Sequence, residues 1–147
     1  MSFHGMPART AQLGDPYQNQ CHATADMLAL RLGLKKDGYV VTFQSRFGKA
    51  KWLEPYTEPT LRQLGKQGVG RVDVLCPGFV SDCIETLEEI AMEGKEAFLS
   101  SGGQSFNYIA CLNDRLEWIR ALTGIVENHL QGWSTRAGQE AASVRPI

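Results

Sequence analysis

Short apolar runs alternate with longer helical patterns along this chain of 147 residues. Three runs are rich in β-branched or aromatic residues and are bounded by glycine or polar turns, which predicts buried strands at 39–43, 72–76 and 106–111. The segments between them have the apolar spacing of amphipathic helices. Strands that alternate with helices form βαβ units, so the sequence predicts an α/β fold with a parallel sheet and helices on both faces. Ligands of such sheets bind at the carboxyl ends of the strands.

Two of the predicted helices have clear signals at their ends. The first spans residues 16–32, with Asp15 as its N-cap and Gly33 as its stop. Its apolar stripe consists of Cys21, Ala25, Leu28 and Leu32. Asp82 and Glu85 form a pair that resembles a capping box and opens a later helix, whose apolar stripe we expect to pack on the sheet. That stripe consists of Ile84, Leu87 and Ala91.

Composition narrows the class of protein. Fifteen Lys and Arg against sixteen Asp and Glu leave a net charge of -1, so the chain has no broad positive field for nucleic acid. The longest apolar run is far shorter than the roughly 20 residues of a membrane-spanning helix, and the first residues lack a signal core, so we expect a cytoplasmic protein. The four cysteines lie too far apart in sequence for a zinc ribbon or an iron–sulfur loop, which indicates reduced thiols.

The domain limits follow from composition as well. From Gln131 onward the chain contains few large apolar residues, which predicts one domain over residues 1–131 and a loosely held tail over residues 132–147. At the other end, Ser2 to Gly5 resemble the last residues of a strand and its loop, although no strand precedes them. A shortened chain would begin in this way.

His4 is the first candidate for chemistry. It follows the presumed strand end and is flanked by Gly5 and Pro7, which allow a close approach to a ligand and then stiffen the chain. On position alone, an exposed histidine without a role is the simpler interpretation. A neutral imidazole can nevertheless ligate a metal or accept a proton, so the functional interpretation stays open.

A line of carboxylates is the second candidate. The segment 76–90 starts at a strand end and runs into a helix, where Asp82, Glu85 and Glu89 are spaced i, i+3 and i+7 and share one face. One interpretation is a solvated face whose acids favour the positive end of the helix dipole. The other is a path for a divalent cation, because such ions take carboxylate oxygens together with imidazole nitrogen.

A third cluster follows the strand predicted at 39–43. It contains Gln44, Ser45 and Trp52 among several aromatic residues. These aromatic side chains could fill the core or form the wall of a flat apolar pocket, and composition does not separate the two.

At these same residues the chain resembles the ferrochelatase family of bacteria, over nearly everything from Ser2 to about Leu130. Five motifs occur in the family's order and with the family's separations. They are Ser2-Phe3-His4-Gly5-Met6-Pro7, Gly14-Asp15-Pro16-Tyr17, Phe43-Gln44-Ser45, Trp52-Leu53 and Ser81-Asp82-Cys83-Ile84-Glu85-Thr86-Leu87.

The resemblance implies two similar flavodoxin-like halves that hold a porphyrin in the cleft between them, of which this chain supplies only the second. It implies a lyase that inserts Fe²⁺ into protoporphyrin IX to form protohaem in haem biosynthesis. The missing N-terminal half is then a required partner, and the fragment alone is expected to be inactive. Family members are often peripheral to the inner membrane.

The resemblance also assigns roles to residues. It implies that His4 takes the pyrrole protons or ligates iron and that Glu85 is its carboxylate partner in catalysis and metal handling. The remaining roles are an acidic path through Asp82 and Glu89 and a porphyrin pocket with Gln44, Ser45 and Trp52. Cys83 departs from the pattern, because many relatives carry a histidine there. No cysteine-rich tail follows Leu130, so we expect no iron–sulfur cluster and no tightly bound cofactor, with Fe²⁺ as a substrate.

Two alternatives remain at this point. One is a non-catalytic module that takes up haem or a metal without inserting anything. The other is a chelatase for another tetrapyrrole or another divalent ion.

Overall fold

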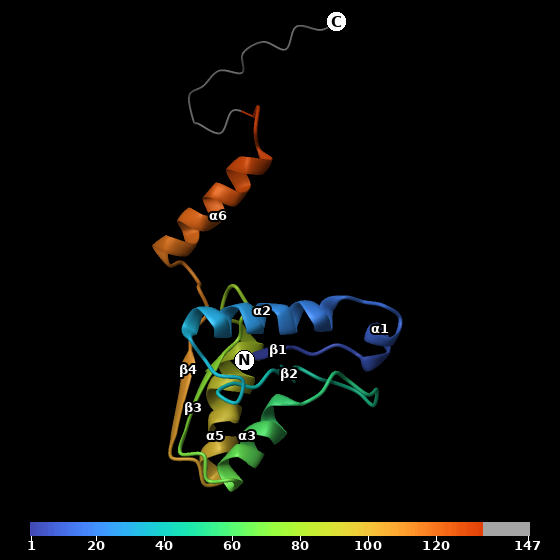
Figure 1. Cartoon of the computed structure of the whole chain (residues 1–147), viewed down its shortest axis with the longest axis vertical. Coiled ribbons are helices and arrows are strands. Elements are labelled where there is room, and N and C mark those ends of the chain that lie inside the picture. The colour runs from blue at the N-terminus through green and yellow to red at the C-terminus, as the bar shows by residue number, and fades with distance from the viewer. Residues whose placement is uncertain (134–147) are drawn as a thin grey trace, which may run out of the picture. The chain divides into compact units, whose positions relative to one another are not determined.

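The computed structural model of the chain describes residues 1–133 (Figure 1). Contacts divide it into two compact units, Met1–Asn113 and Asp114–Ile147. Most of the tail predicted at 132–147 lies outside the described residues, so that boundary stays a prediction.

Parallel strands joined by helices form the first unit, which confirms the predicted α/β class. Its four strands are β1 (Ser2–His4), β2 (Thr42–Gln44), β3 (Arg71–Leu75) and β4 (Ser105–Ile109). The β1–β2 pair and the β3–β4 pair are each parallel, with Ser2 opposite Thr42 and Arg71 opposite Ser105. Figure 1 shows β3 and β4 running side by side.

Helices provide the crossovers that parallel pairing requires. The chain passes from β1 to β2 through α1 (Ala8–Gln12) and α2 (Tyr17–Leu32), and from β2 to β3 through α3 (Thr57–Lys66). One continuous helical segment joins β3 to β4. It consists of α4 (Ile84–Thr86), the π-helix η1 (Leu87–Gly94) and α5 (Lys95–Ser100).

The strands form two separate two-stranded sheets in the described part, whereas the sequence predicted a single sheet. The strand predicted at 39–43 begins only at Thr42. Before Thr42, the Val40 carbonyl accepts a hydrogen bond from the Met1 amino group at 2.7 Å.

Two apolar clusters stabilise the first unit. One packs α2 against β1 and β2, and it consists of Met1, Phe3, Cys21, Ala25, Ala29, Val41, Phe43 and Leu53. The other joins α3, η1 and α5 to the β3–β4 pair, and it consists of Leu61, Val74, Cys76, Ile90, Phe98 and Cys111.

The C-terminal end of α2 agrees with the prediction, but its N-cap is Pro16 rather than Asp15, and its buried stripe also differs. Gly33 ends the helix in the left-handed conformation, at φ 67°, and the Asp15 carboxylate accepts a hydrogen bond from the Tyr17 amide at 2.8 Å. Ala29 is buried, whereas Leu32, which the predicted stripe placed inward, is exposed. The small alanine side chains let α2 pack closely on β1 and β2.

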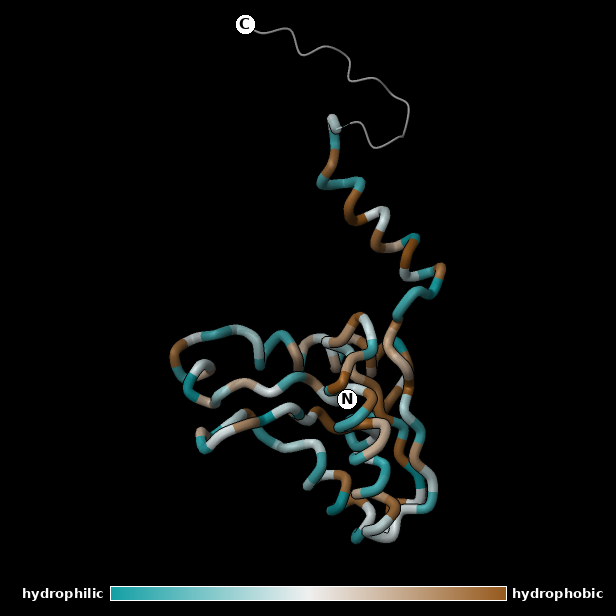
Figure 2. The backbone as a smooth tube through the Cα atoms, turned by 180° about the vertical axis from the view of Figure 1, so that it is seen from behind, coloured by the Kyte–Doolittle hydropathy of each residue, from teal (hydrophilic) through white to brown (hydrophobic). Residues whose placement is uncertain are grey.

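The second unit contains α6 (Leu116–His129). Hydrophobic and hydrophilic residues alternate along this helix in Figure 2, and none of its residues is buried. Among residues 1–133, no helix combines the length and the hydropathy that a membrane crossing requires.

Candidate active site

A cavity of about 490 Å³ opens where β1 and β2 end. His4 is the last residue of β1 and Ser45 directly follows β2, so both lie at carboxyl ends of parallel strands, as the fold class predicts. The cavity is lined by His4, Ser45, Arg46, Phe47, Ile84, Glu85, Glu88, Glu89 and Glu93. Side chains from two strand ends therefore face side chains of the α4–η1 segment.

His4 presents one free ring nitrogen. Its Nδ1 lies 2.6 Å from the Gly5 carbonyl oxygen. Because a carbonyl can only accept, this contact requires a proton on Nδ1, which leaves the lone pair on Nε2 available as a base or as a metal ligand. The Tyr17 hydroxyl donates to the carbonyl of His4 at 2.9 Å and holds the backbone in place.

Gly5 explains how the loop of His4 stays close to β2. The Gly5 amide donates to the Gln44 carbonyl at 2.7 Å, and a Cβ atom on residue 5 would come within 2.6 Å of that same oxygen. Any side chain here would push His4 away from the end of β2.

Four glutamates form the opposite wall, and their arrangement differs from the predicted line. In the π-helix η1 the backbone bonds run from i to i+5, so a turn holds more residues than in an α-helix. Residues four apart therefore lie close to one line along the helix, and Glu85, Glu89 and Glu93 all line the cavity together with Glu88. The α-helical spacing assumed from sequence missed Glu88 and Glu93.

The buried face of this helical segment was predicted wrongly. Ile84 is 67% exposed and Leu87 is also exposed, although both were expected to pack on the sheet. Thr86, Ile90 and Gly94 face the core instead. Their spacing of four residues is the spacing that the wider π-turn favours.

Asp82 does not line the cavity with the glutamates. Its carboxylate accepts hydrogen bonds from Tyr108 at 2.6 Å, Asn113 at 2.7 Å and Thr86 at 3.0 Å. It ties the loop after β3 to the segment after β4. Its assignment to an acidic path stays a prediction, and its contacts are those of a structural anchor.

Cys83 is the N-cap of α4, and its backbone amide donates to the Thr86 hydroxyl at 3.0 Å. The predicted capping pair of Asp82 and Glu85 is thus replaced by Cys83 and Thr86. The neighbouring Cys83 side chain holds the pKa of the Glu85 carboxyl below its ordinary value, and His4 contributes in the same direction. Glu85 therefore stays ionised beside the imidazole.

The three predicted pocket residues occupy different positions. Ser45 lines the cavity, and its amide and hydroxyl both donate to Glu89 Oε2, at 2.8 and 3.1 Å. Gln44 is buried beneath the cavity, where its Nε2 donates to the Glu85 carbonyl at 2.6 Å. It therefore positions the start of α4 relative to the end of β2.

Trp52 is only 6% exposed and acts from behind the cavity wall. Its Nε1 donates to the Phe47 carbonyl at 3.0 Å, and the two rings lie 5.2 Å apart. Phe47 itself is 76% exposed and lines the cavity. A large aromatic side chain in a polar loop is a signal that could have identified Phe47 from sequence. Arg46, which also lines the cavity, lies 4.2 Å over the ring of Tyr56.

Within residues 1–133, no three His, Cys, Asp or Glu side chains converge on a point that could hold an ion. His4 and the glutamates line one cavity without forming a closed ligand shell, so a cation here would keep open coordination positions and exchange readily.

Parallel βα units with a cavity at their carboxyl ends define the class of α/β ligand-binding domains. Within that class, the sequence model of the ferrochelatase family matches residues 1–130, and the chain belongs to this family.

Three curated relatives named ferrochelatase show how much of the protein this chain represents. The relative from Methylibium petroleiphilum is 62% identical over 99% of this chain and 40% of its own length. Those from Herminiimonas arsenicoxydans and Bordetella pertussis are 65% and 59% identical, each over 92% of this chain and 37% of the relative. The chain thus spans about 40% of the length of the curated relatives it matches.

Proposed function

We propose that this chain is part of a ferrochelatase, a lyase that inserts Fe²⁺ into protoporphyrin IX to form protohaem in haem biosynthesis. One observation carries the proposal: the free Nε2 of His4 and a row of glutamates line the same cavity. Membership of the family supports the same reaction.

The residues of the cavity suit the chemistry of metal insertion. Free-base porphyrin carries two N–H protons, which must leave as a divalent ion enters. His4 Nε2 is the base for these protons, and the ionised Glu85 stabilises the imidazolium that forms. Glu88, Glu89 and Glu93 attract the cation without enclosing it, so that the ion can pass to the ring.

The flat apolar part of the site is supplied by Phe47, which Trp52 supports from behind. We propose that the porphyrin ring packs against this aromatic edge and that the rest of the longer chain covers its other face. Fe²⁺ is a substrate in this scheme, with neither an iron–sulfur cluster nor another resident cofactor. We place the whole enzyme in the cytoplasm, in peripheral contact with the inner membrane.

His4 and Glu85 provide the direct test. In the full-length protein, His4→Ala and Glu85→Gln should each lower kcat by about 10²- to 10⁴-fold, the usual contribution of a general base, while porphyrin affinity stays nearly unchanged. The double variant should be scarcely slower than either single one, because residues that act as a unit are not additive. Steady-state kinetics and porphyrin fluorescence titration measure the two quantities.

Matched controls are His22→Ala and Glu96→Gln, because both residues are exposed and neither lines the cavity. Both controls should keep normal turnover. Near-normal turnover in a site variant would remove that residue from the mechanism. A collapse of porphyrin binding would show that the residue has a structural role.

A further inference from the structure

Two residues that line the candidate active site are joined by hydrogen bonds that the proposed reaction does not use. The Ser45 amide and hydroxyl both donate to Glu89 Oε2, at 2.8 and 3.1 Å. Within the described part of the chain, the side chains of Glu88 and Glu93 make no such contact, although both line the same cavity. Glu89 is therefore distinguished from these two glutamates by its bonds to the segment that follows β2.

The backbone of Ser45 has a conformation that favours glycine. Its φ is 62°, and Asn113 is the only other non-glycine residue with positive φ among residues 1–133. A left-handed turn costs free energy in a residue with a Cβ atom, whereas glycine adopts it freely. The two hydrogen bonds offset this cost, because bonds to a carboxylate are roughly twice as strong as bonds between neutral groups. The serine hydroxyl provides one of them, which glycine could not.

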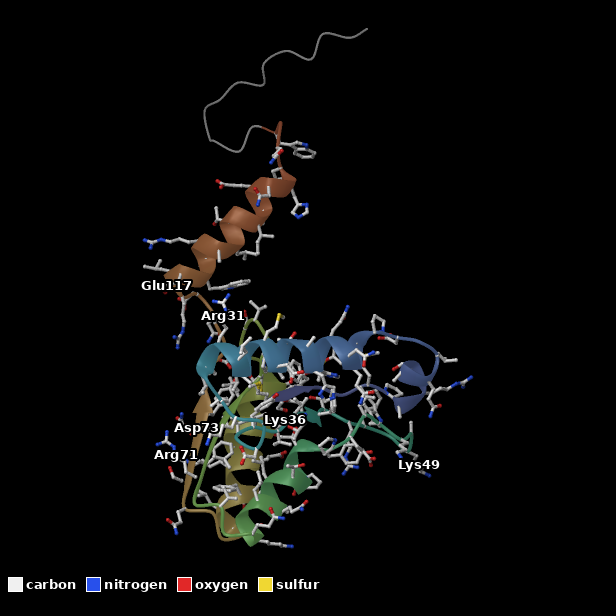
Figure 3. All side chains as sticks on the ribbon, viewed as in Figure 1. Arg31, Lys36, Lys49, Arg71, Asp73 and Glu117 are labelled. Carbon is white, nitrogen blue, oxygen red and sulfur yellow. The ribbon has the colours of Figure 1, made fainter. Side chains whose placement is uncertain are left out.

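The turn at Ser45 sets the course of the segment that follows β2. We call residues 45–51 the cavity loop, because Phe47 within it lines the cavity. Figure 3 shows Lys49 at the outer end of this loop, away from the strands. Because residues 46–51 are all exposed, the anchor points of the loop determine where Phe47 lies.

The cavity loop has separate anchors at its two ends. At its far end the Lys51 carbonyl accepts a hydrogen bond from the Ala8 amide at 2.8 Å. In its middle the Phe47 carbonyl accepts from Trp52 Nε1 at 3.0 Å. At its start the anchor is Glu89, which belongs to the π-helix η1 and not to the neighbouring strands. The position of the first turn of the loop therefore depends on this carboxylate.

We propose that Glu89 is a positioning residue for the porphyrin side of the site: its carboxylate holds Ser45 in the left-handed turn, and the turn holds Phe47 at the cavity. The charge of Glu89 still contributes to the attraction of the cation, but its distinctive task is the placement of the aromatic edge. The placement of the loop rests on the structure alone, whereas its effect on porphyrin rests on the proposed function.

Hydrogen exchange of the full-length protein without substrates tests the placement of the loop. Mass spectrometry of the peptides that cover residues 45–53 is the readout. Glu89→Ala should accelerate their exchange by about tenfold, because the loop loses its first anchor. Glu89→Gln keeps an oxygen that can accept from Ser45, so its effect should be much smaller. The matched control is Glu88→Ala, which removes a carboxylate of the same cavity that does not bond Ser45 and should leave this exchange unchanged.

Substitutions of Ser45 separate the turn from the hydroxyl. Ser45→Gly and Ser45→Ala both remove the hydroxyl, but only glycine adopts the left-handed turn without cost. Adding Glu89→Ala should therefore accelerate the exchange of residues 46–53 clearly less in the glycine background than in the alanine background. Equal acceleration in the two backgrounds would overturn the role of the turn, and so would equal exchange in Glu89→Ala and Glu89→Gln.

Steady-state kinetics of the full-length protein tests the consequence for porphyrin. Glu89→Ala and Glu89→Gln remove the same charge, so the dependence of turnover on Fe²⁺ should change alike in both. The porphyrin KM should rise by about tenfold in Glu89→Ala alone, the upper end of what one aromatic contact contributes. An equal porphyrin KM in the two variants would overturn the positioning role. If the wild-type protein inserted no iron, the proposed function would fail, while the exchange experiment would still decide the placement of the loop.

Discussion

At the scale of the residue, the hydrogen bonds around Asp82 determine its charge state and its contribution to stability. Burial raises the pKa of its carboxyl, but the hydrogen bonds from Tyr108, Asn113 and Thr86 outweigh that effect and hold the pKa well below its ordinary range. A carboxyl with a lowered pKa in the folded state stabilises the fold above its unfolded pKa, near 3.9, and loses this contribution as the pH falls toward the folded pKa.

We therefore predict that Asp82→Asn lowers the free energy of unfolding at pH 7 by about 1.5–3 kcal/mol, the range for hydrogen bonds to a charged group. The difference between wild type and variant should shrink as the pH falls below about 4. Thermal unfolding between pH 2 and 7 measures both effects, with Glu96→Gln as the control. A constant difference across this range would argue against an ionised Asp82 in the fold.

At the scale of the element, the two faces of the α4–η1–α5 segment have different tasks. One face packs in the core and stabilises the fold, and the other lines the candidate active site. Glu85, Glu89 and Glu93 face the cavity, while Thr86 and Ile90 face the core. The glutamates repeat every four residues, and so do the buried residues. Because a turn of the π-helix holds more residues than an α-helical turn, each set stays on its own face of the segment. The apolar face supports the β3–β4 pair, so it holds the glutamates in position indirectly.

Ile90 and Met92 lie two residues apart on this segment and provide a matched comparison. Ile90 is 1% exposed, so Ile90→Ala should lower the free energy of unfolding by about 2–5 kcal/mol through the cavity it leaves. Met92 is 67% exposed, so Met92→Ala should change it by less than about 0.5 kcal/mol. Urea unfolding of the two variants measures this. Similar losses of unfolding free energy in the two variants would contradict the placement of Ile90 in the core and Met92 at the surface.

At the scale of the whole molecule, the chain supplies only part of what the proposed reaction needs. Its cavity is open, and Phe47 offers an aromatic contact from one side. A porphyrin held on one face only would not be fixed in the orientation that metal insertion requires, so the reaction would be slower.

We predict that the chain alone, mixed with protoporphyrin IX and Fe²⁺ without oxygen, forms protohaem at little more than the uncatalysed rate. Absorbance of the metallated ring measures the product, and a full-length relative under the same conditions is the positive control. Turnover by the chain close to that of the full-length relative would contradict the proposal that the rest of the longer chain must cover the other face of the porphyrin.

Local signals in the sequence determined the α/β class, the helix that ends at Gly33 and the placement of His4 at the end of a strand. These features can be read from short stretches of sequence, because the spacing of apolar residues and the turn residues at the ends of an element lie within a few positions of one another. The motifs also carried the family resemblance, which the match over residues 1–130 confirmed.

Tertiary structure decided what local patterns leave open. The π-helix, whose Ile90 packs in the second apolar cluster, places Glu93 at the cavity. Asp82 lies outside the cavity, and Ile84 is exposed. Trp52 is buried and the neighbouring Phe47 is exposed, because only the fold determines which of two neighbouring rings is covered. The strand predicted at 39–43 was shortened for the same reason: a strand needs a partner, and partners come from distant parts of a chain.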